Sequence, residues 1–222
     1  MDVVLRIGGS ILASPLKGAL IRDYSRTIHQ LLSEGNRLGI VVGGGEIARQ
    51  YIAVASELGL KNYQKDRFAI SVSRLNAELI SSALGEFQIA KSILSAKSIF
   101  KSKGFVVMGG LRPGMTTDYV AFLLARALNF DLILKATDQN GIYDKDPRYN
   151  VDAKLLKELN YSELSKLIER ASYTPGIHSI VDPLTVSGLP GTNIKLIVFN
   201  GLIPNNLIDA VKGKNVGTLV TP

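Results

Sequence analysis

The chain has 222 residues, of which 46% are hydrophobic, and its mean hydropathy is +0.18, so it can bury a substantial core and is not a disordered chain. It contains no cysteine, which excludes disulfide frameworks, thiolate metal sites and cysteine nucleophiles. No run of about 18 uncharged apolar residues occurs. The first seven residues place an acid and a base around a short apolar run, which is unlike a signal peptide. We therefore expect a cytoplasmic protein with no membrane partner.

The charge balance points to an anionic partner. Lysine and arginine number 26 against 19 acids, which gives a net charge of +7 and a pI near 9.5. Such a balance is typical of proteins that bind nucleic acid, a membrane surface or small phosphorylated ligands. The bases are scattered, however, and 7% aromatic residues without tryptophan leave little surface for stacking bases. We expect the lysine clusters to be solvated and nucleic acid not to be a partner.

Short apolar runs alternate with amphipathic stretches along almost the whole chain. In chain order, the pattern predicts a strand at 3–7, a helix from Pro15 (N-cap Ser14) that stops at Gly35, a strand at 38–42, a helix ending at Gly59, a helix at about 68–84, a strand at 105–108, a helix after the cap at 116–118, a strand at 132–134, a helix at about 162–170, a strand at 194–199, a helix at 205–211 and an edge strand at 217–220.

This alternation favours right-handed crossover units and a mainly parallel sheet that helices cover on both faces. No repeat and no Pro/Gly/Ser linker divides the chain. The predicted fold class is α/β, with one domain over residues 1–222 built as a three-layer α/β/α sandwich. Its two halves, about 1–130 and 131–222, meet just before the strand at 132–134.

Three of the predicted strands end in glycines, at Gly8-Gly9, at 43–45 and at 109–110. Glycine at the carboxyl end of a buried strand lets a phosphate approach the backbone, and the following helix directs its free N–H groups toward that phosphate. In open parallel sheets, ligands bind at this edge. The three turns together predict a phosphate site.

Two common phosphate motifs fit only in part. Residues 109–116 have P-loop glycine spacing, but Met115 stands where the lysine belongs. Residues 43–48 match the loose dinucleotide fingerprint, yet they follow the second strand, and Asp66 does not end a strand. Neither motif identifies the site.

Four blocks of sequence, at 6–10, 42–49, 110–118 and 136–147, resemble the amino acid kinase superfamily in this order. Within that superfamily the whole chain is similar to uridylate (UMP) kinases of the archaeal type. The resemblance implies transfer of the γ-phosphoryl group of MgATP to UMP. It implies Mg²⁺ as the cofactor, delivered with ATP, and no metal site made by the protein. It further implies that residues 1–130 bind the acceptor and residues 131–222 bind ATP.

The resemblance also implies site residues. The UMP-binding positions are Gly44, Asp66, Arg112, Pro113, Gly114, Met115, Thr116, Thr117 and Asp118. The ATP-binding positions are Gly8, Gly9, Ser10, Gly45, Arg49, Thr137, Asp138, Tyr143 and Asp146.

Arg6, Asp118 and Asp182 are the candidate catalytic residues. Arg6 stands where the family usually has lysine; Asp118 would organise the cations, and family members often carry an acid at Asp182. The alternatives are a helix N-cap for Asp118 and a turn acid before Pro183 for Asp182. Lys135 ends an apolar strand and offers a second cation, although a lysine that snorkels to solvent is the favoured interpretation.

Other functions remain open at this point. One alternative is the acceptor of an isopentenyl phosphate, carbamate or acylglutamate kinase, although the histidine that isopentenyl phosphate kinases carry after the triple glycine is missing. A non-catalytic nucleotide sensor is the other alternative, because Arg6 and Asn140 depart from the family pattern. The resemblance further implies a homo-oligomer, namely a hexamer, and feedback inhibition by UTP.

Overall fold

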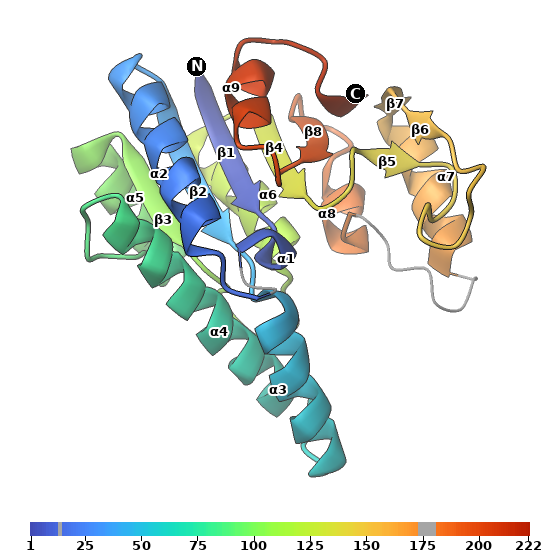
Figure 1. The fold of residues 1–222 in the computed structure, drawn as a ribbon, viewed down its shortest axis with the longest axis horizontal. Coiled ribbons are helices and arrows are strands. Elements are labelled where there is room, and N and C mark those ends of the chain that lie inside the picture. The colour runs from blue at the N-terminus through green and yellow to red at the C-terminus, as the bar shows by residue number, and fades with distance from the viewer. Residues whose placement is uncertain (13–14, 173–180) are drawn as a thin grey trace.

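The computed structural model describes residues 1–12, 15–172 and 181–222, and its strands form one large sheet and one small one (Figure 1). Neighbouring strands of the large sheet are parallel except β8 and β9, which are antiparallel. The small sheet is antiparallel and pairs β5 (Ile142–Tyr143) with β6 (Leu155–Leu156). In spatial order, the large sheet contains β3 (Phe105–Met108), β2 (Arg37–Val42), β1 (Asp2–Ile7), β4 (Leu132–Thr137), β8 (Lys195–Asn200), β9 (Gly217–Thr221) and β7 (Glu158–Asn160).

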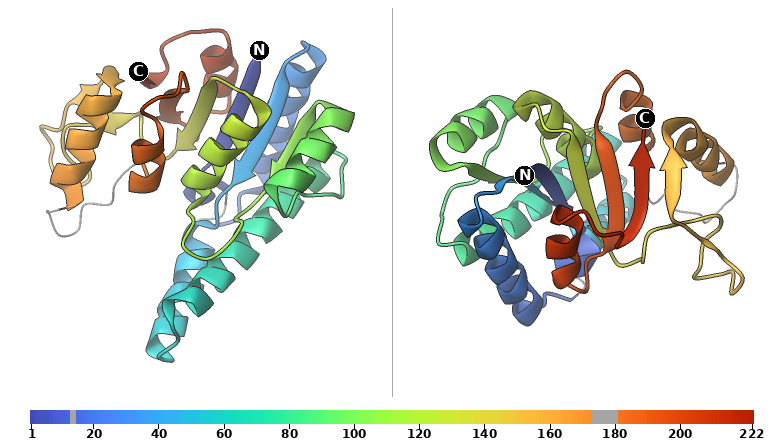
Figure 2. Two further views of the ribbon diagram at one scale, coloured as in Figure 1. Left: turned by 180° about the vertical axis from the view of Figure 1, so that it is seen from behind. Right: turned by 90° about the horizontal axis from the view of Figure 1, so that it is seen from above.

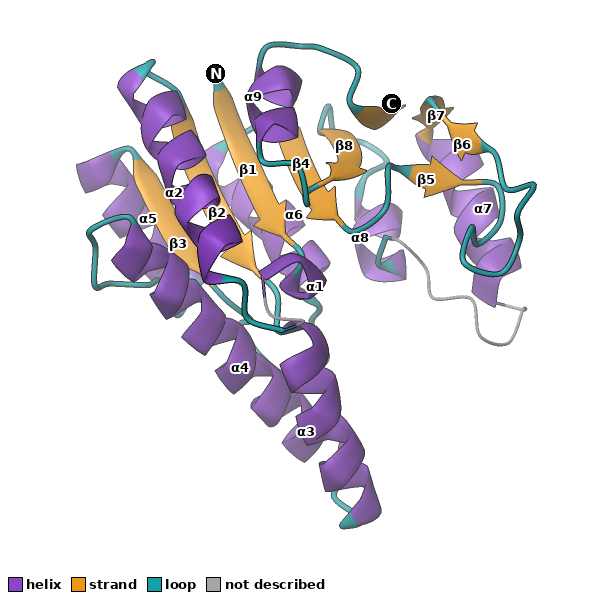
Figure 3. Ribbon diagram, in the orientation of Figure 1, coloured by secondary structure: helices purple, strands orange, loops and turns teal. Residues whose placement is uncertain are grey.

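Helices cover both faces of the large sheet, as Figures 2 and 3 show. One apolar core packs α2, α4 and α9 against the sheet, and a second core packs α5, α6, α7 and α8 against the opposite face. The predicted three-layer α/β/α sandwich is therefore confirmed. The helices are α1 (Gly9–Leu12), α2 (Gly18–Ser33), α3 (Gly45–Glu57), α4 (Asn62–Ala83), α5 (Ile93–Lys103), α6 (Thr117–Leu128), α7 (Tyr161–Ser172), α8 (Pro183–Gly188) and α9 (Asn205–Val211).

Strand β1 shows how the sequence builds these layers. Val3, Leu5 and Ile7 lie in the core with α2, whereas Val4 lies in the core with α6. Alternate side chains of a strand point to opposite faces, so an unbroken apolar run is what a strand needs when both faces are buried. Among the described helices, none is long and apolar enough to span a bilayer.

The start of the first long helix was predicted wrongly. Helix α2 begins at Gly18 rather than at Pro15, and the predicted cap Ser14 lies outside the described residues. The backbone N–H of Lys17 donates to the carbonyl of Leu12 at 3.0 Å, so this stretch closes a turn onto α1 instead of opening α2.

Other differences lie at the ends of the elements. Strand β9 is not an edge strand, because it pairs with both β8 and β7. Helix α4 begins at Asn62, six residues before the predicted start, since the N–H of Lys61 donates to Oε1 of Gln64 and caps the earlier turn. Strand β4 continues to Thr137.

Candidate active site

The strand order β2-β1-β4 brings three loops to one edge of the sheet. The N–H of Gly8 donates to the carbonyl of Ala136 at 3.0 Å, and the N–H of Gly43 donates to the carbonyl of Ile7 at 3.0 Å. The loops that follow β1, β2 and β4 are thereby fixed side by side, at the edge where open parallel sheets bind ligands.

The first two glycine turns touch each other. A Cβ atom on Gly9 would lie 2.0 Å from the backbone nitrogen of Gly45, and one on Gly43 would lie 2.8 Å from the nitrogen of Gly9. Gly45 also has a φ of +68°, a conformation that favours glycine. The result is a cradle of bare backbone in front of α1 and α3, which a side chain at Gly9 or Gly45 would fill.

In the third glycine turn, the glycines make room for a helix rather than for another glycine loop. A Cβ atom on Gly109 would lie 2.7 Å from the backbone nitrogen of Arg74, and the N–H of Gly110 donates to Oγ of Ser73 at 2.8 Å. Helix α4 therefore occupies the space beside this pair. The close approach of α4 is therefore one reason for these two glycines, and the expectation that they also admit a phosphate stays a prediction.

Residues 110–118, which we call the acceptor turn after the role that the resemblance implies, lead from β3 into the first turn of α6. Thr116 is the N-cap of α6, because its Oγ1 accepts from the N–H of Tyr119 at 3.2 Å. Asp66 on α4 accepts from the N–H of Gly114 at 2.8 Å, so these two predicted UMP residues are in direct contact. Arg112 and Pro113 are exposed, and Met115 is half-buried against the core.

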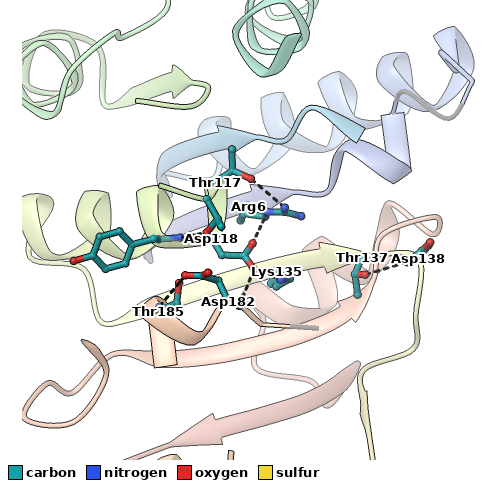
Figure 4. Close-up of polar contacts among 10 residues, drawn as sticks. Arg6, Thr117, Asp118, Lys135, Thr137, Asp138, Asp182 and Thr185 are labelled. Carbon is teal, nitrogen blue, oxygen red and sulfur yellow. Dashed lines mark hydrogen bonds and ion pairs between the residues drawn. The ribbon is translucent and has the colours of Figure 1, made fainter. Parts of the chain in front are cut away.

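A buried cluster of charges joins the first strand to the acceptor turn (Figure 4). The carboxylate of Asp118 forms one ion pair with Nε of Arg6 at 2.7 Å and a second with Nζ of Lys135. The Arg6 guanidinium also donates to Oγ1 of Thr117 at 3.1 Å. The Asp118 and Lys135 side chains are 10% and 8% exposed, so solvent has little access to this pair.

Two earlier interpretations are corrected by this cluster. Lys135 does not snorkel to solvent, because Asp118 pairs with it inside the protein. Asp118 is not the N-cap of α6, since Thr116 has that role.

Asp182 lies beside the cluster and caps a helix. Its carboxylate accepts from the N–H of Thr185 at 3.0 Å, which makes it the N-cap of α8, while its own N–H donates to Oδ2 of Asp118 at 3.3 Å (Figure 4). The structure thus shows the turn acid that the sequence allowed as an alternative, and also places Asp182 against the candidate catalytic aspartate.

Burial disfavours the charged forms of Asp118 and Lys135, whereas the ion pairs between them and with Arg6 favour these forms. Burial by itself would raise the pKa of Asp118, but the positive charges of Arg6 and Lys135 hold that pKa below its usual value. Burial lowers the pKa of Lys135, against the opposing effect of Asp118. The Arg6 Nε and Asp118 Oδ1 atoms lie at ion-pair distance without the alignment of a hydrogen bond to any described residue.

The predicted ATP residues occupy several loops at this edge. Ser10 lies in α1, and Thr137, at the end of β4, donates to Asp138 at 3.2 Å. Arg49 is exposed and pairs with Glu46 one helical turn before it. Its guanidinium therefore does not join the buried cluster.

The loop after β4 contains the last two predicted ATP residues. Asn140 donates to the hydroxyl of the half-buried Tyr143 at 3.5 Å. Asp146 is buried and accepts from the backbone N–H and the guanidinium of Arg148, so it organises its own turn.

The residues present fit a magnesium nucleotide better than a metal cage of the protein's own. The described ranges hold no group of three or more histidine, cysteine, aspartate or glutamate side chains at metal-binding distance. The bare backbone between Gly9 and Gly45 suits a polyphosphate, and the exposed carboxylate of Asp138 lies at the same edge. Magnesium typically binds proteins through one or two carboxylates together with substrate phosphates.

Sequence reasoning missed the polar contacts that α4 makes with these loops. Ser73, Arg74 and Asn76 hydrogen-bond to glycine loops, and Ser73 and Asn76 are buried. A signal was present, because polar residues stand at positions of α4 that face the core. Only the position of the loops reveals what these residues bind.

Comparison with known proteins identifies the family of the chain. The model of the amino acid kinase family matches residues 1–200. The chain is 37% identical to the uridylate kinase of Sulfurisphaera tokodaii and 38% identical to that of Methanococcus maripaludis, with alignments that span the full length of both proteins in each case. The crystal structure of uridylate kinase from Archaeoglobus fulgidus superposes with a TM-score of 0.90 at 35% identity, again over the whole of both chains. The chain belongs to the amino acid kinase family, and within it to the uridylate kinases.

Proposed function

We propose that the protein transfers the γ-phosphoryl group of MgATP to UMP and releases UDP and ADP. The observation that carries this proposal is the Arg6–Asp118–Lys135 cluster, which lies between the backbone cradle at Gly9 and the acceptor turn. Two polyanions that react with each other need positive charge and fixed positions at their meeting point.

The reaction needs no strong base. An oxygen of the UMP phosphate, already anionic, attacks the γ-phosphorus of ATP. The bond from that phosphorus to the oxygen bridging the β-phosphorus breaks, and the electron pair leaves with ADP. Arg6 and Lys135 stabilise the negative charge that collects between the two nucleotides, and Asp118 keeps both cations aimed at the same place.

The two nucleotides divide the site between them. On the acceptor side, Gly44, Asp66 and the turn from Arg112 to Asp118 hold UMP, with Asp66 accepting from ribose hydroxyls. On the ATP side, the phosphates are held by Gly8, Gly9, Ser10 and Gly45. Arg49 leaves its ion pair with Glu46 and binds a phosphate. The rest of the nucleotide is held by Thr137, Asp138, Tyr143 and Asp146. This division assigns about residues 1–130 to the acceptor and 131–222 to ATP.

Magnesium would arrive with ATP and neutralise part of its charge. Asp138 is the exposed carboxylate nearest in sequence to the end of β4 and would contact the ion or its water shell. Asp182 acts on Asp118 through its backbone N–H rather than on a nucleotide. We place the reaction in the cytoplasm, where ATP and UMP are both available.

Phosphorus NMR tests this proposal directly. The protein is incubated with MgATP and one acceptor at a time. The acceptors are UMP, CMP, isopentenyl phosphate, aspartate and N-acetylglutamate. We expect UDP to appear with UMP. If ADP forms with a different acceptor, the proposed site stands but UMP is not the substrate. If ATP binds and no acceptor is phosphorylated, the protein is a nucleotide sensor and not a kinase. Adding UTP to the active mixture tests the feedback inhibition that the resemblance implies.

We also propose that the chain forms a homo-oligomer, and the resemblance implies a hexamer. Helices α3 and α4 extend beyond the end of the sheet in Figure 1, and both expose large apolar side chains. An exposed apolar surface of this kind is typical of protein interfaces. These side chains are Tyr51, Val54, Tyr63, Phe68, Leu75 and Leu79, together with Leu58, the residue that directly follows α3.

Light scattering coupled to size-exclusion chromatography tests this proposal. A mass of one chain would contradict it. If a larger species is found, Leu58→Lys and Leu75→Lys should reduce its mass, whereas Leu16→Lys, an exposed leucine outside α3 and α4, should not.

A further inference from the structure

Three side chains of helix α4 form hydrogen bonds with the backbone of the acceptor turn. Asp66 accepts from the N–H of Gly114, Ser73 accepts from the N–H of Gly110, and Arg74 donates to two carbonyls of the turn. Most of the remaining polar side chains on this helix face solvent. The turn is thus attached to one rigid element over its first half.

Arg74 makes the double contact. Its Nε donates to the carbonyl of Gly110 at 3.0 Å, and its Nη2 donates to the carbonyl of Leu111 at 3.0 Å. The N–H groups of a guanidinium have a fixed fork geometry, so one side chain sets the orientation of two consecutive peptide planes.

The orientation of these planes determines where their N–H groups point. In a trans peptide, the C=O and the following N–H point in opposite directions. With the carbonyls of Gly110 and Leu111 turned toward Arg74, the N–H groups of Leu111 and Arg112 point away from it. Within the described parts of the chain, neither N–H group donates a backbone hydrogen bond. Two free donors are therefore presented on the side of the turn opposite to α4.

The same helix also holds the second glycine loop. Asn76, which is buried, donates from Nδ2 to the carbonyl of Gly43 at 2.9 Å and to that of Gly44 at 3.3 Å. Arg74 and Asn76 are two residues apart on one helix. The spacing between the acceptor turn and the Gly43-Gly44 loop is consequently fixed by α4 and not by either loop.

We propose that Arg74 is a positioning residue for the acceptor nucleotide. It does not touch the substrate; it holds the peptide planes of the acceptor turn so that the N–H groups of Leu111 and Arg112 donate to oxygen atoms of the bound nucleotide. This inference rests on the proposed function, because it assigns a role within the same acceptor site.

Three variants separate positioning from general folding. Arg74→Gln removes the fork and the charge, and Arg74→Lys keeps the charge but donates from a single nitrogen. Arg67→Gln is the matched control, since Arg67 lies two turns earlier on α4 and is exposed. The readouts are KM for UMP, KM for ATP, kcat, the melting temperature and hydrogen–deuterium exchange of residues 109–116 in the absence of nucleotide.

We expect Arg74→Gln to raise KM for UMP by about 10- to 100-fold, the effect of losing a charge-assisted contact, while KM for ATP stays within about twofold. Exchange across 109–116 should accelerate, and Arg74→Lys should recover part of both losses. Arg67→Gln should leave every readout unchanged. An unchanged KM for UMP in Arg74→Gln, or equal losses for UMP and ATP, would overturn the proposal.

The design distinguishes this inference from the function on which it rests. A wild-type protein that does not phosphorylate UMP would overturn the proposed function, while the exchange measurement would still decide whether Arg74 fixes the turn. If Arg74→Gln does not fold, Arg74→Lys decides the question by the same split between KM for UMP and KM for ATP.

Discussion

Gly9 and Gly45 lie so close together that a Cβ atom on Gly9 would be 2.0 Å from the backbone nitrogen of Gly45. In the other direction, a Cβ atom on Gly45 would lie 2.4 Å from the carbonyl oxygen of Gly9. No real side chain tolerates such distances, and both neighbours are backbone atoms that cannot rotate away. The contact between the first two loops of the site therefore depends on the absence of two side chains.

Gly9→Ala should force these loops apart. We expect at least a tenfold loss of MgATP affinity and a decrease of about 1–3 kcal/mol in the free energy of unfolding, as for other overpacked sites. Calorimetric titration and thermal melting measure the two effects. Gly18→Ala is the control, because a Cβ atom there meets nothing within 4 Å. Full ATP affinity in Gly9→Ala would show that the cradle does not bind the nucleotide.

Arg49→Ala should weaken ATP binding. A charge-assisted contact to phosphate contributes about 1.5–3 kcal/mol, so we expect a loss of tenfold or more, measured by titration with MgATP. Arg26→Ala is a matched control, because Arg26 pairs with Asp23 three residues earlier, as Arg49 pairs with Glu46. If both variants bind ATP as the wild type does, Arg49 is a surface residue and not part of the site.

Asp118→Asn should lower kcat more than it lowers substrate affinity, because Asp118 aligns Arg6 and Lys135, whereas Asp66 and the rest of the acceptor turn still hold UMP. Steady-state kinetics with UMP and MgATP separate the two quantities. Equal losses in kcat and in both affinities would assign Asp118 to general folding.

The same substitution should also destabilise the protein. Removing one partner of a buried ion pair leaves the other unpaired and typically costs about 3–5 kcal/mol. The double variant Asp118→Asn/Lys135→Met removes the Asp118–Lys135 pair and leaves only the charge of Arg6, whose side chain is 17% exposed. We therefore expect it to recover part of the stability but not the turnover. Denaturant unfolding supplies the stability, and recovery of full activity by the double variant would contradict the proposed role of the cluster.

Acid should reveal the pairing of Asp118. Its pKa in the folded protein lies below the usual value of 3.8 because Arg6 and Lys135 favour the charged form despite burial. The unfolded chain therefore takes up the proton first as the pH falls, so the contribution of this pair is complete above pH 3.8 and is lost as the pH falls through the folded pKa. We expect the free energy of unfolding to fall more steeply below about pH 4 in the wild type than in Asp118→Asn. If the free energy of unfolding depends on pH in the same way in both proteins, the pairing of Asp118 does not contribute to stability as we expect.

The sequence predicted what local pattern determines. The continuous apolar runs at β1, β2 and β3 and the cap at Thr116 are short-range signals, and the structure confirms them. Elements of two or three residues, such as β5 and β7, carry too little pattern to be recognised, and tertiary pairing creates them. Element ends shifted where a local turn or cap formed that the apolar pattern does not show, as at Lys17 and at Lys61.

The candidate site was less predictable, because its chemistry depends on pairs far apart in the chain. Whether Lys135 snorkels or pairs is decided by Asp118, 17 residues earlier and on another element. The local sequence likewise does not show that the Gly109-Gly110 pair leaves room for Ser73 and Arg74 of α4. Residue type and spacing identify which groups are present, whereas the fold decides which partner each group meets.

The position of β1 in the interior of the sheet, between β2 and β4, has a consequence for how the protein is made. Its partners are β2, where Val4 pairs with Gly39, and β4, where Val4 pairs with Ile133. During synthesis, one edge of the first strand stays open until residues 132–137 leave the ribosome. Open apolar edges attract other chains, and such distant pairings slow folding. The nascent protein must therefore keep β1 protected until β4 has been synthesised.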